Sequence, residues 1–270
     1  MEFADMHIHT RAGARVTGRG VLKSMDAVGM TRAVLISAQQ NESDATERAA
    51  IDRLAAVVRA DRKRLVGFAW IEPTVAGAVE RVTYAIEKHR LRGIKMIPNH
   101  WYPYEERLFP VYKRIEELRV PLLFHSGILY GNGDSSRFCR PCFFEVMLHF
   151  PKIKFALAHI SWPWTDECIA TFGRMRAAVG YKTRDCQMYI DTTRGTPRFY
   201  RTDALRKALL FAGPDRIIYG SDDSIPSPFT YAQEGALVDH DIITGELGFP
   251  EEACRKILRD NLDDFLKPMD

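Results

Sequence analysis

The sequence predicts an α/β protein folded as a single (β/α)8 TIM barrel over residues 1–270, and three observations support this. Short apolar β-type runs alternate with longer amphipathic stretches, which is the pattern of βαβ units around a parallel sheet. Some runs, such as Ala33–Ile36, are apolar throughout, as strands buried on both faces are. The 270 residues match the roughly 250 that such a barrel needs.

Each predicted element follows from its pattern. The β-type runs predict eight strands, at Phe3–His9, Ala33–Ser37, Leu65–Ile71, Gly93–Ile97, Pro121–His125, Lys154–His159, Gln187–Asp191 and Arg216–Ser221. Apolar residues at helical spacing predict helices at Glu42–Ala60, Val75–His89, Glu105–Leu118, Phe143–Phe150, Asp166–Val179, Thr202–Phe211 and Glu251–Leu258. Pro110 indicates that the third of these helices begins near it, because proline fits the first helical turn.

Three long connections are expected to be the βα loops that build active sites in this fold. They follow strands one, five and eight, at Thr10–Gly20, Ser126–Arg137 and Asp222–Asp239. No internal repeat or linker interrupts the alternation, so the sequence predicts one domain.

Composition excludes several classes of function. The net charge is only +3, and lysine and arginine are scattered, which argues against nucleic-acid binding. No apolar run approaches the roughly 20 residues that span a membrane. Met1–Asp5 lacks the pattern of a signal peptide, so a cytoplasmic location is expected. Cys139 and Cys142 form a single CxxC pair, which predicts ordinary reduced thiols.

The first strand carries a pair of histidines suited to metal binding. Side chains alternate across a strand, so His7 and His9 point to the same side. Two imidazoles at one strand end can reach the same cation.

Three later strands also end in groups that bind metals or move protons. They are His125 on strand five, His159 on strand six and Asp222 on strand eight. In a TIM barrel these ends converge on one mouth, so the sequence predicts one metal-dependent catalytic site there.

The order His-x-His, His, His, Asp on strands one, five, six and eight resembles the amidohydrolase superfamily. More narrowly, it is similar to the amidohydrolase-related branch that contains aminocarboxymuconate semialdehyde decarboxylase and its hydrolase relatives. The resemblance covers nearly the whole chain, with supporting stretches at Val66–Ala69, Gly93–Lys95, Phe150–Lys154, Tyr219–Asp222 and Ile257–Asn261.

The resemblance implies specific roles. His7, His9, His125 and Asp222 would hold one divalent metal, and His159 would act in acid/base chemistry beside it. Imidazole and carboxylate donors suit Zn²⁺ first, with Mn²⁺ or Fe²⁺ as alternatives. A homodimer is also expected from the resemblance.

Such a site predicts a metal-dependent hydrolase. A bound divalent metal lowers the pKa of water toward about 7. Asp222 would both bind the metal and accept a proton, and His159 would orient the nucleophile or donate to a developing oxyanion. Non-oxidative decarboxylation can start from the same site and remains the alternative.

Other residues at the predicted mouth are candidates for substrate binding. Lys95, on strand four, and Arg194, after strand seven, are expected to bind a substrate carboxylate, so the expected partner is a small carboxylated molecule. Lys95 has a second interpretation, as a carboxylated lysine bridging two metals, with His125 and His159 holding the second. Asp191 would orient a metal ligand. Trp162 would wall the pocket, or would only pack at its loop–helix junction.

Two further functions are less favoured. His7–Thr10 also resembles the start of PHP-type phosphoesterases, but the Ser-Asp-Gly element that follows there is absent. TatD-like nucleases carry Gly-Glu on strand four, where this chain has Gly93–Lys95. A non-catalytic barrel that binds metal or a small ligand is disfavoured because all four expected ligands are present.

Overall fold

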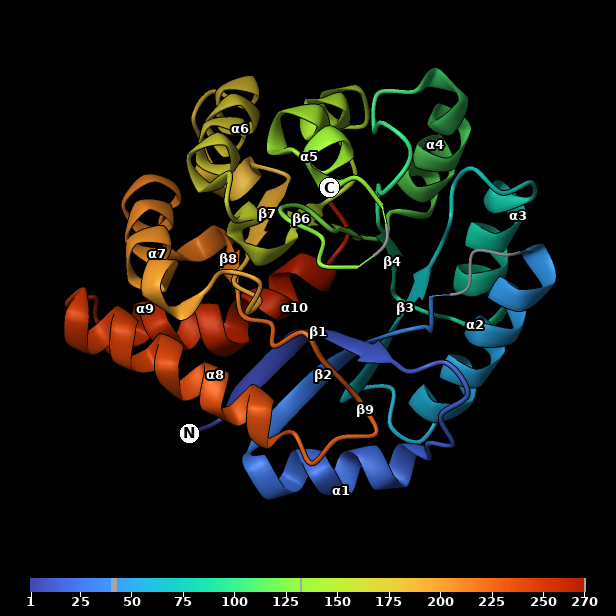
Figure 1. Cartoon of the computed structure of the whole chain (residues 1–270), viewed down its shortest axis with the longest axis horizontal. Helices are drawn as coiled ribbons and strands as arrows, with labels where there is room; N and C mark the ends of the chain where they lie inside the picture. Colours follow the sequence, from blue (N-terminus) through green and yellow to red (C-terminus); the bar gives the residue numbers. More distant parts are fainter. Residues whose placement is uncertain (40–42, 132, 270) are drawn as a thin grey trace.

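The computed structural model describes residues 1–39, 43–131 and 133–269. Parallel strands form a central barrel, and helices surround it (Figure 1). The strands are β1 (Phe3–Thr10), β2 (Met30–Ile36), β3 (Leu65–Trp70), β4 (Gly93–Met96), β5 (Leu122–Phe124), β6 (Phe155–Leu157), β7 (Met188–Asp191), β8 (Ile217–Ile218) and β9 (Asp223–Ile225). Their order in the sheet, β8-β7-β6-β5-β4-β3-β2-β1-β9, follows the chain. The predicted TIM-barrel fold is confirmed.

The eighth strand of the barrel is divided into two parts. The predicted strand Arg216–Ser221 is shortened to β8, because the N–H of Tyr219 donates to the carbonyl of Ile257 at 3.0 Å and not to β7. The backbone then turns at Asp222, whose φ is 62°. After this turn β9 pairs in parallel with β1. Between the two parts, the N–H of Met6 donates to the carbonyl of Tyr219 at 3.1 Å. β8 pairs with β7 on one side, while Tyr219 and β9 bond to β1 on the other, so the ring of strands closes.

The surrounding helices are mostly those expected. The α-helices are α1 (Gly18–Val28), α2 (Asp44–Val58), α3 (Ala78–Thr83), α4 (Phe109–Leu118), α5 (Ser135–Phe138), α6 (Thr165–Ala178), α7 (Arg198–Ala212), α8 (Thr230–His240), α9 (Glu251–Arg255) and α10 (Asn261–Leu266). Pro110 lies in the first turn of α4, as predicted. The predicted helix Phe143–Phe150 is a 3-10 helix, η3 (Pro141–His149). Glu42, the predicted start of α2, lies outside the described residues.

All three predicted loops are wrong in part, and the second of them, Ser126–Arg137, already contains the start of α5 at Ser135. α1 already begins at Gly18, capped by the Thr17 hydroxyl, so the first loop is shorter than expected. The segment Asp222–Asp239 contains β9 and most of α8. Glycines in the first turn of α1 and prolines before α8 weaken the helical pattern, and tertiary packing restores both helices.

Apolar side chains form two layers, one between strands and helices and one inside the barrel. The inner layer includes Met6, Leu123 and Tyr189. Phe265 and Leu266 of α10 belong to the same inner cluster, so α10 closes one end of the barrel. Lys154 Nζ donates to the carbonyl of Asp264 at 2.5 Å, beside the start of β6, which places α10 at the amino-terminal end of the strands.

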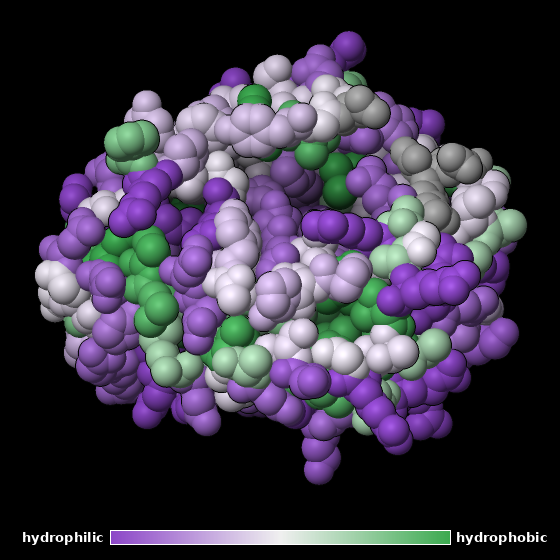
Figure 2. All heavy atoms as spheres, turned by 60° about the horizontal axis from the view of Figure 1, so that its bottom comes forward, coloured by the Kyte–Doolittle hydropathy of each residue, from purple (hydrophilic) through white to green (hydrophobic). Residues whose placement is uncertain are grey.

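On the face shown in Figure 2, hydrophilic residues predominate and the hydrophobic residues form separate patches. None of the described helices is both long and apolar enough to cross a lipid bilayer.

Candidate metal centre

A β-bulge in β1 aims the two predicted histidines at the site. Ala4 and Met6 belong to the cluster inside the barrel. Between Asp5 and Ile8 the register with β2 shifts by one residue, since these residues pair with Ala33 and Leu35. A bulge re-aims the side chains that follow it. His7 and His9 thereby face the same point at the carboxyl end of the barrel.

His7, His9 and Asp222 form the one group of three potential metal ligands that the described part of the chain brings together. One ligand atom from each lies within 4.8 Å of the others. His9 Nε2 is 3.1 Å from His7 Nε2 and 3.2 Å from Asp222 Oδ1. The His7 side chain is 1% exposed, whereas those of His9 and Asp222 are 30% and 38% exposed. The group is thus buried on one side and open to solvent on the other.

The protonation of His7 is suited to metal binding. Its Nδ1 lies 2.8 Å from Oδ2 of Asp191, which is fully buried. An N–H on Nδ1 donates to this carboxylate, so the lone pair is on Nε2. Burial, reinforced by the charge of Lys95, lowers the pKa of His7 well below its usual value. A neutral imidazole nitrogen therefore faces a second imidazole and a carboxylate oxygen, and this donor set fits a divalent cation.

His125 and His159 complete a cluster of histidine rings around His7. The His159 ring centroid lies 5.5 Å from that of His7 and 4.9 Å from that of His125. His125 is outside the three-residue group, but its Nε2 is buried without a hydrogen-bond partner among the described residues, as is Nδ1 of His159. Buried nitrogens without partners are costly unless something else satisfies them. They are further donors that fit a cation or its ligands.

The backbone around His159 is strained. His159, Ile160 and Ser161 have φ values of 63°, 47° and 54°, in the left-handed region. For non-glycine residues this costs on the order of 1–3 kcal/mol each, and such strain concentrates at functional sites. The Thr196 hydroxyl donates to the His159 carbonyl at 2.7 Å and the His159 N–H donates to Thr193 Oγ1 at 3.1 Å, which holds the segment in place.

Burial and neighbouring groups shift the pKa values of two charged residues at the site, Lys95 and Asp222. Burial lowers the pKa of Lys95 to about 8, against the opposing charges of Asp222 and Asp191. Desolvation raises the pKa of Asp222, but the hydrogen bond with His9 and the nearby rings of His7 and His159 outweigh it, so the pKa lies well below its usual range. Asp222 is therefore ionised at neutral pH.

The predicted substrate-binding residues lie in different places. Lys95 is fully buried, with Nζ 3.2 Å from His7 Nε2, so it belongs to the cluster. Arg194 lies with its guanidinium carbon 3.7 Å from the ring centroid of Tyr231 on α8. Trp162 is half-buried beside Tyr200, with ring centroids 5.9 Å apart, and lines a cavity of ≈ 530 Å³ between α6 and α7. Only Lys95 is brought into contact with a predicted ligand.

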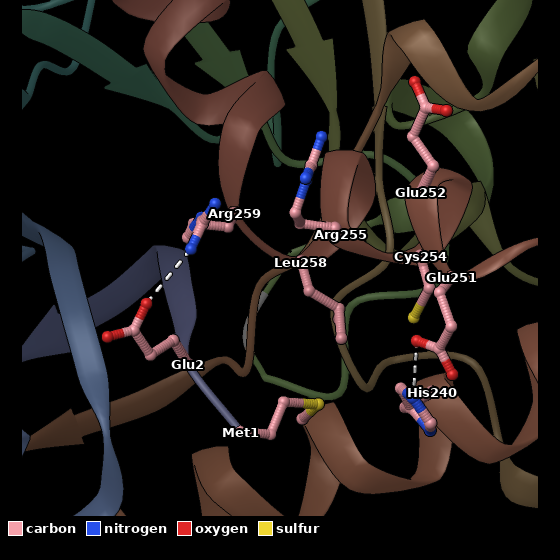
Figure 3. Close-up of a pocket in the computed structure, with 9 residues that line it drawn as sticks. All are labelled: Met1, Glu2, His240, Glu251, Glu252, Cys254, Arg255, Leu258 and Arg259. Atoms are coloured by element: carbon pink, nitrogen blue, oxygen red, sulfur yellow. Dashed lines mark hydrogen bonds and ion pairs between the residues drawn. The ribbon is translucent and has the colours of Figure 1, made fainter.

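A second cavity, of ≈ 510 Å³, lies away from the histidine cluster (Figure 3). It is lined by Met1, Glu2, His240, Glu251, Glu252, Cys254, Arg255, Leu258 and Arg259. Arg259 pairs with Glu2 at 3.0 Å and His240 with Glu251 at 3.1 Å, as Figure 3 shows. None of the predicted metal-binding or substrate-binding residues lines this cavity, so it is separate from the histidine cluster.

Sequence reasoning anticipated the contact between Asp191 and a predicted ligand, but it missed Thr193. The Thr193 hydroxyl donates to Asp191 Oδ1 at 2.7 Å and accepts from the N–H of His159. Its place two residues after Asp191, just beyond the end of β7, is the only signal in the sequence that could have found it.

Comparison with known proteins identifies the family. The amidohydrolase family model matches residues 4–262, and the chain belongs to this family. The family expected from the strand-end motifs is therefore confirmed. No match was found among curated proteins.

Solved structures share the fold over nearly the whole chain. The structure of 2,6-dihydroxybenzoate decarboxylase from Rhizobium is 17% identical, with 98% of each chain covered and a TM-score of 0.70. A probable 2-pyrone-4,6-dicarboxylic acid hydrolase from Acinetobacter baumannii, with citric acid bound, is 14% identical, with 98% of this chain and 99% of that chain covered and a TM-score of 0.65. A 5-carboxyvanillate decarboxylase from Novosphingobium aromaticivorans, complexed with manganese and a nitrobenzoic acid, is 14% identical, with 91% and 79% covered and a TM-score of 0.67.

Proposed function

We propose that this chain is a metal-dependent hydrolase in which activated water attacks a small carboxylated molecule. The observation that carries the proposal is the meeting of His7, His9 and Asp222 at the carboxyl end of the barrel, with His159 and Lys95 beside them. In this fold the carboxyl ends of the strands are where active sites are built.

His7, His9 and Asp222 would hold the cation, with His125 as the fourth ligand. The nearest nitrogens and oxygen of the first three converge, and the Nε2 of His125 is buried without a partner. Zn²⁺ is the metal that such imidazole and carboxylate donors favour, with Mn²⁺ or Fe²⁺ as alternatives. A divalent metal bound there makes water more acidic and polarises a carbonyl oxygen.

Proton transfer is assigned to Asp222 and His159. Asp222 is ionised and partly exposed, so its carboxylate can accept a proton from a nucleophilic water. Burial lowers the pKa of His159 to about 4, with Asp222 opposing, so its ring is neutral at pH 7. A neutral ring without a partner on Nδ1 can orient a nucleophile or stabilise a developing oxyanion.

A carboxylated substrate is inferred from Lys95 and supported by the structural neighbours. Lys95 places a cationic group beside His7, where it can bind a carboxylate. The Acinetobacter structure holds citric acid and the Novosphingobium structure holds a nitrobenzoic acid, so two similar barrels bind small acids. Arg194 is proposed as a more distant anion-binding group and Trp162 as a pocket wall.

Decarboxylation is the second candidate. Two of the similar structures are decarboxylases of aromatic acids, and a cation-binding cluster beside a lysine also suits loss of carbon dioxide from such an acid. The residues of the cluster do not separate the two reactions.

The test is to load the purified protein with Zn²⁺ and separately with Mn²⁺, and to screen carboxylated lactones, enol acids and aromatic acids. A hydrolase would consume a lactone or other hydrolysable substrate and release a proton without releasing carbon dioxide. Release of carbon dioxide from a good substrate would overturn the hydrolase assignment in favour of the lyase. An Asp222→Asn variant is the control, and it should lose turnover in either case.

A further inference from the structure

Two helices outside the barrel share a buried ion pair. Arg201 on α7 and Asp239 on α8 have side chains that are 4% and 0% exposed. Arg201 Nε donates to Asp239 Oδ1 at 2.5 Å and Nη2 donates to Oδ2 at 2.6 Å. The desolvation cost of a buried pair can cancel its attraction, so stability alone is a weak explanation for it. The other hydrogen bonds that Arg201 and Asp239 make therefore indicate what the pair does.

Both residues of the pair hydrogen-bond to Thr192, the residue that follows β7. Arg201 Nη2 also donates to the carbonyl of Thr192 at 2.6 Å, and the Thr192 hydroxyl donates to Asp239 Oδ2 at 3.0 Å. The N–H of Thr192 donates to the carbonyl of Ile218 on β8 at 2.9 Å. Thr192 is thus fixed through its backbone and its side chain at once.

The residues on either side of Thr192 hold the histidine cluster. The N–H and hydroxyl of Thr193 both donate to Asp191 Oδ1 at 2.7 Å, which leaves Oδ2 for His7. The same Thr193 hydroxyl oxygen accepts the N–H of His159. A displacement of Thr192 would therefore disturb His7 and His159 together.

We propose that Arg201 and Asp239 are positioning residues of the metal centre, although neither contacts a predicted ligand. The pair anchors Thr192, and through Asp191 and Thr193 it fixes the orientation of the His7 ring and the backbone of His159. The inference rests on the proposed metal site and adds residues that act on its histidines through Thr192 and the residues on either side of it. Mutation of a residue that hydrogen-bonds a metal-binding histidine typically lowers metal affinity by about 10- to 100-fold, and this sets the scale of the expected effect.

The chain offers a matched control on the other side of the barrel. Arg81 and Glu47 also form a fully buried ion pair, with Nε and Oε2 2.8 Å apart. Arg81 Nη2 donates to the carbonyl of Glu72, two residues after the end of β3, at 3.1 Å. This pair braces a strand end in the same way, but the link that follows reaches only backbone: the Ile71 N–H donates to the carbonyl of Lys95 at 3.0 Å, and among the described residues neither Glu72 nor Ile71 bonds to a histidine of the cluster or to Asp191.

The experiment compares Arg201→Lys, Thr192→Val and Arg81→Lys with the unaltered chain. Lysine keeps the charge but loses the planar fork that bonds Asp239 and Thr192 together, and valine removes only the hydroxyl. Binding of Co²⁺ alone is measured from the visible absorption of the bound ion, and thermal unfolding is measured without metal. Arg201→Lys should weaken Co²⁺ binding by about 10-fold or more and change the band shape. Arg81→Lys should lower the unfolding temperature comparably, with Co²⁺ affinity within about twofold of the unaltered chain.

The possible results separate this inference from the proposed function. Normal Co²⁺ affinity and spectrum in both Arg201→Lys and Thr192→Val would overturn the positioning role and leave the metal site standing. An equal loss of affinity in Arg81→Lys would also overturn it, because the effect would then be general destabilisation. If Arg201→Lys does not fold, Thr192→Val decides. Failure of the unaltered chain to bind Co²⁺ would overturn the proposed function, and the inference with it.

Discussion

Nδ1 of His7 and Oδ2 of Asp191 lie 2.8 Å apart, both from fully enclosed side chains, and this contact fixes which nitrogen of His7 faces the site. His7 belongs to the first strand of the barrel and Asp191 to the seventh. The contact joins β1 and β7, the two strands that flank the divided eighth strand, at the candidate metal site.

Asp191→Asn should weaken Zn²⁺ binding by about 10- to 100-fold with little change in fold. The amide keeps the shape but not the charge that holds the proton on Nδ1. Competition against a chromophoric chelator measures the affinity, and circular dichroism checks the fold. Unchanged affinity would show that the tautomer of His7 is set by something else.

His159→Asn should retain bound metal and lose most turnover, on the order of 10²-fold or more, because proton transfer contributes this much. Asparagine suits the test, since it tolerates the left-handed backbone that His159 adopts at φ 63°. Mass spectrometry measures the bound metal, and the turnover rate is measured on a substrate that the proposed screen identifies. Loss of metal from this variant would instead favour the arrangement in which His125 and His159 hold a second ion.

Gly195→Ala should displace the His159 ring and lower turnover. An added Cβ at Gly195 would lie 2.5 Å from both Cγ and Nδ1 of His159, closer than any stable contact. Gly245→Ala is the control, because a Cβ there meets nothing within 4 Å. Both variants are assayed for turnover and thermal unfolding, and equal activity in the two would contradict the predicted crowding.

The five cysteines should resist alkylation in the folded protein at pH 8. Burial raises the pKa of Cys139 to about 12, and burial together with Glu167 raises that of Cys142 to about 11. A raised pKa keeps a thiol protonated, and the thiolate is the reactive form. Thiol titration should be slow in buffer and complete in guanidinium chloride. Rapid native labelling of the Cys139–Cys142 pair would contradict the prediction of ordinary thiols.

The sequence was informative where chemistry and periodicity coincide. Strand alternation places Leu123 inside the barrel and therefore His125 as well, so a reader of the sequence can predict that His125 faces inward. The family followed from the same strand ends and was confirmed over residues 4–262.

Sequence reasoning failed where distant contacts decide the structure. Nothing near His7 shows that a bulge follows Asp5, since the register depends on pairing with β2. The three left-handed residues from His159 to Ser161 depend on hydrogen bonds from Thr193 and Thr196, more than 30 positions later. The ion pair of Arg201 and Asp239 was missed because each residue, taken singly, looks like a solvated charge on a helix.

The position of α10 at the amino-terminal end of the barrel has a consequence for folding during synthesis. Phe265 and Leu266 fill the amino-terminal end of the barrel, and β9 supplies the last edge to β1. The nascent chain carries an unpaired edge on β1 until β9 has been synthesised, and its apolar floor stays unfilled until α10 follows. Truncated fragments that end before this helix are therefore expected to be aggregation-prone and in need of chaperones, even when they contain every residue of the histidine cluster.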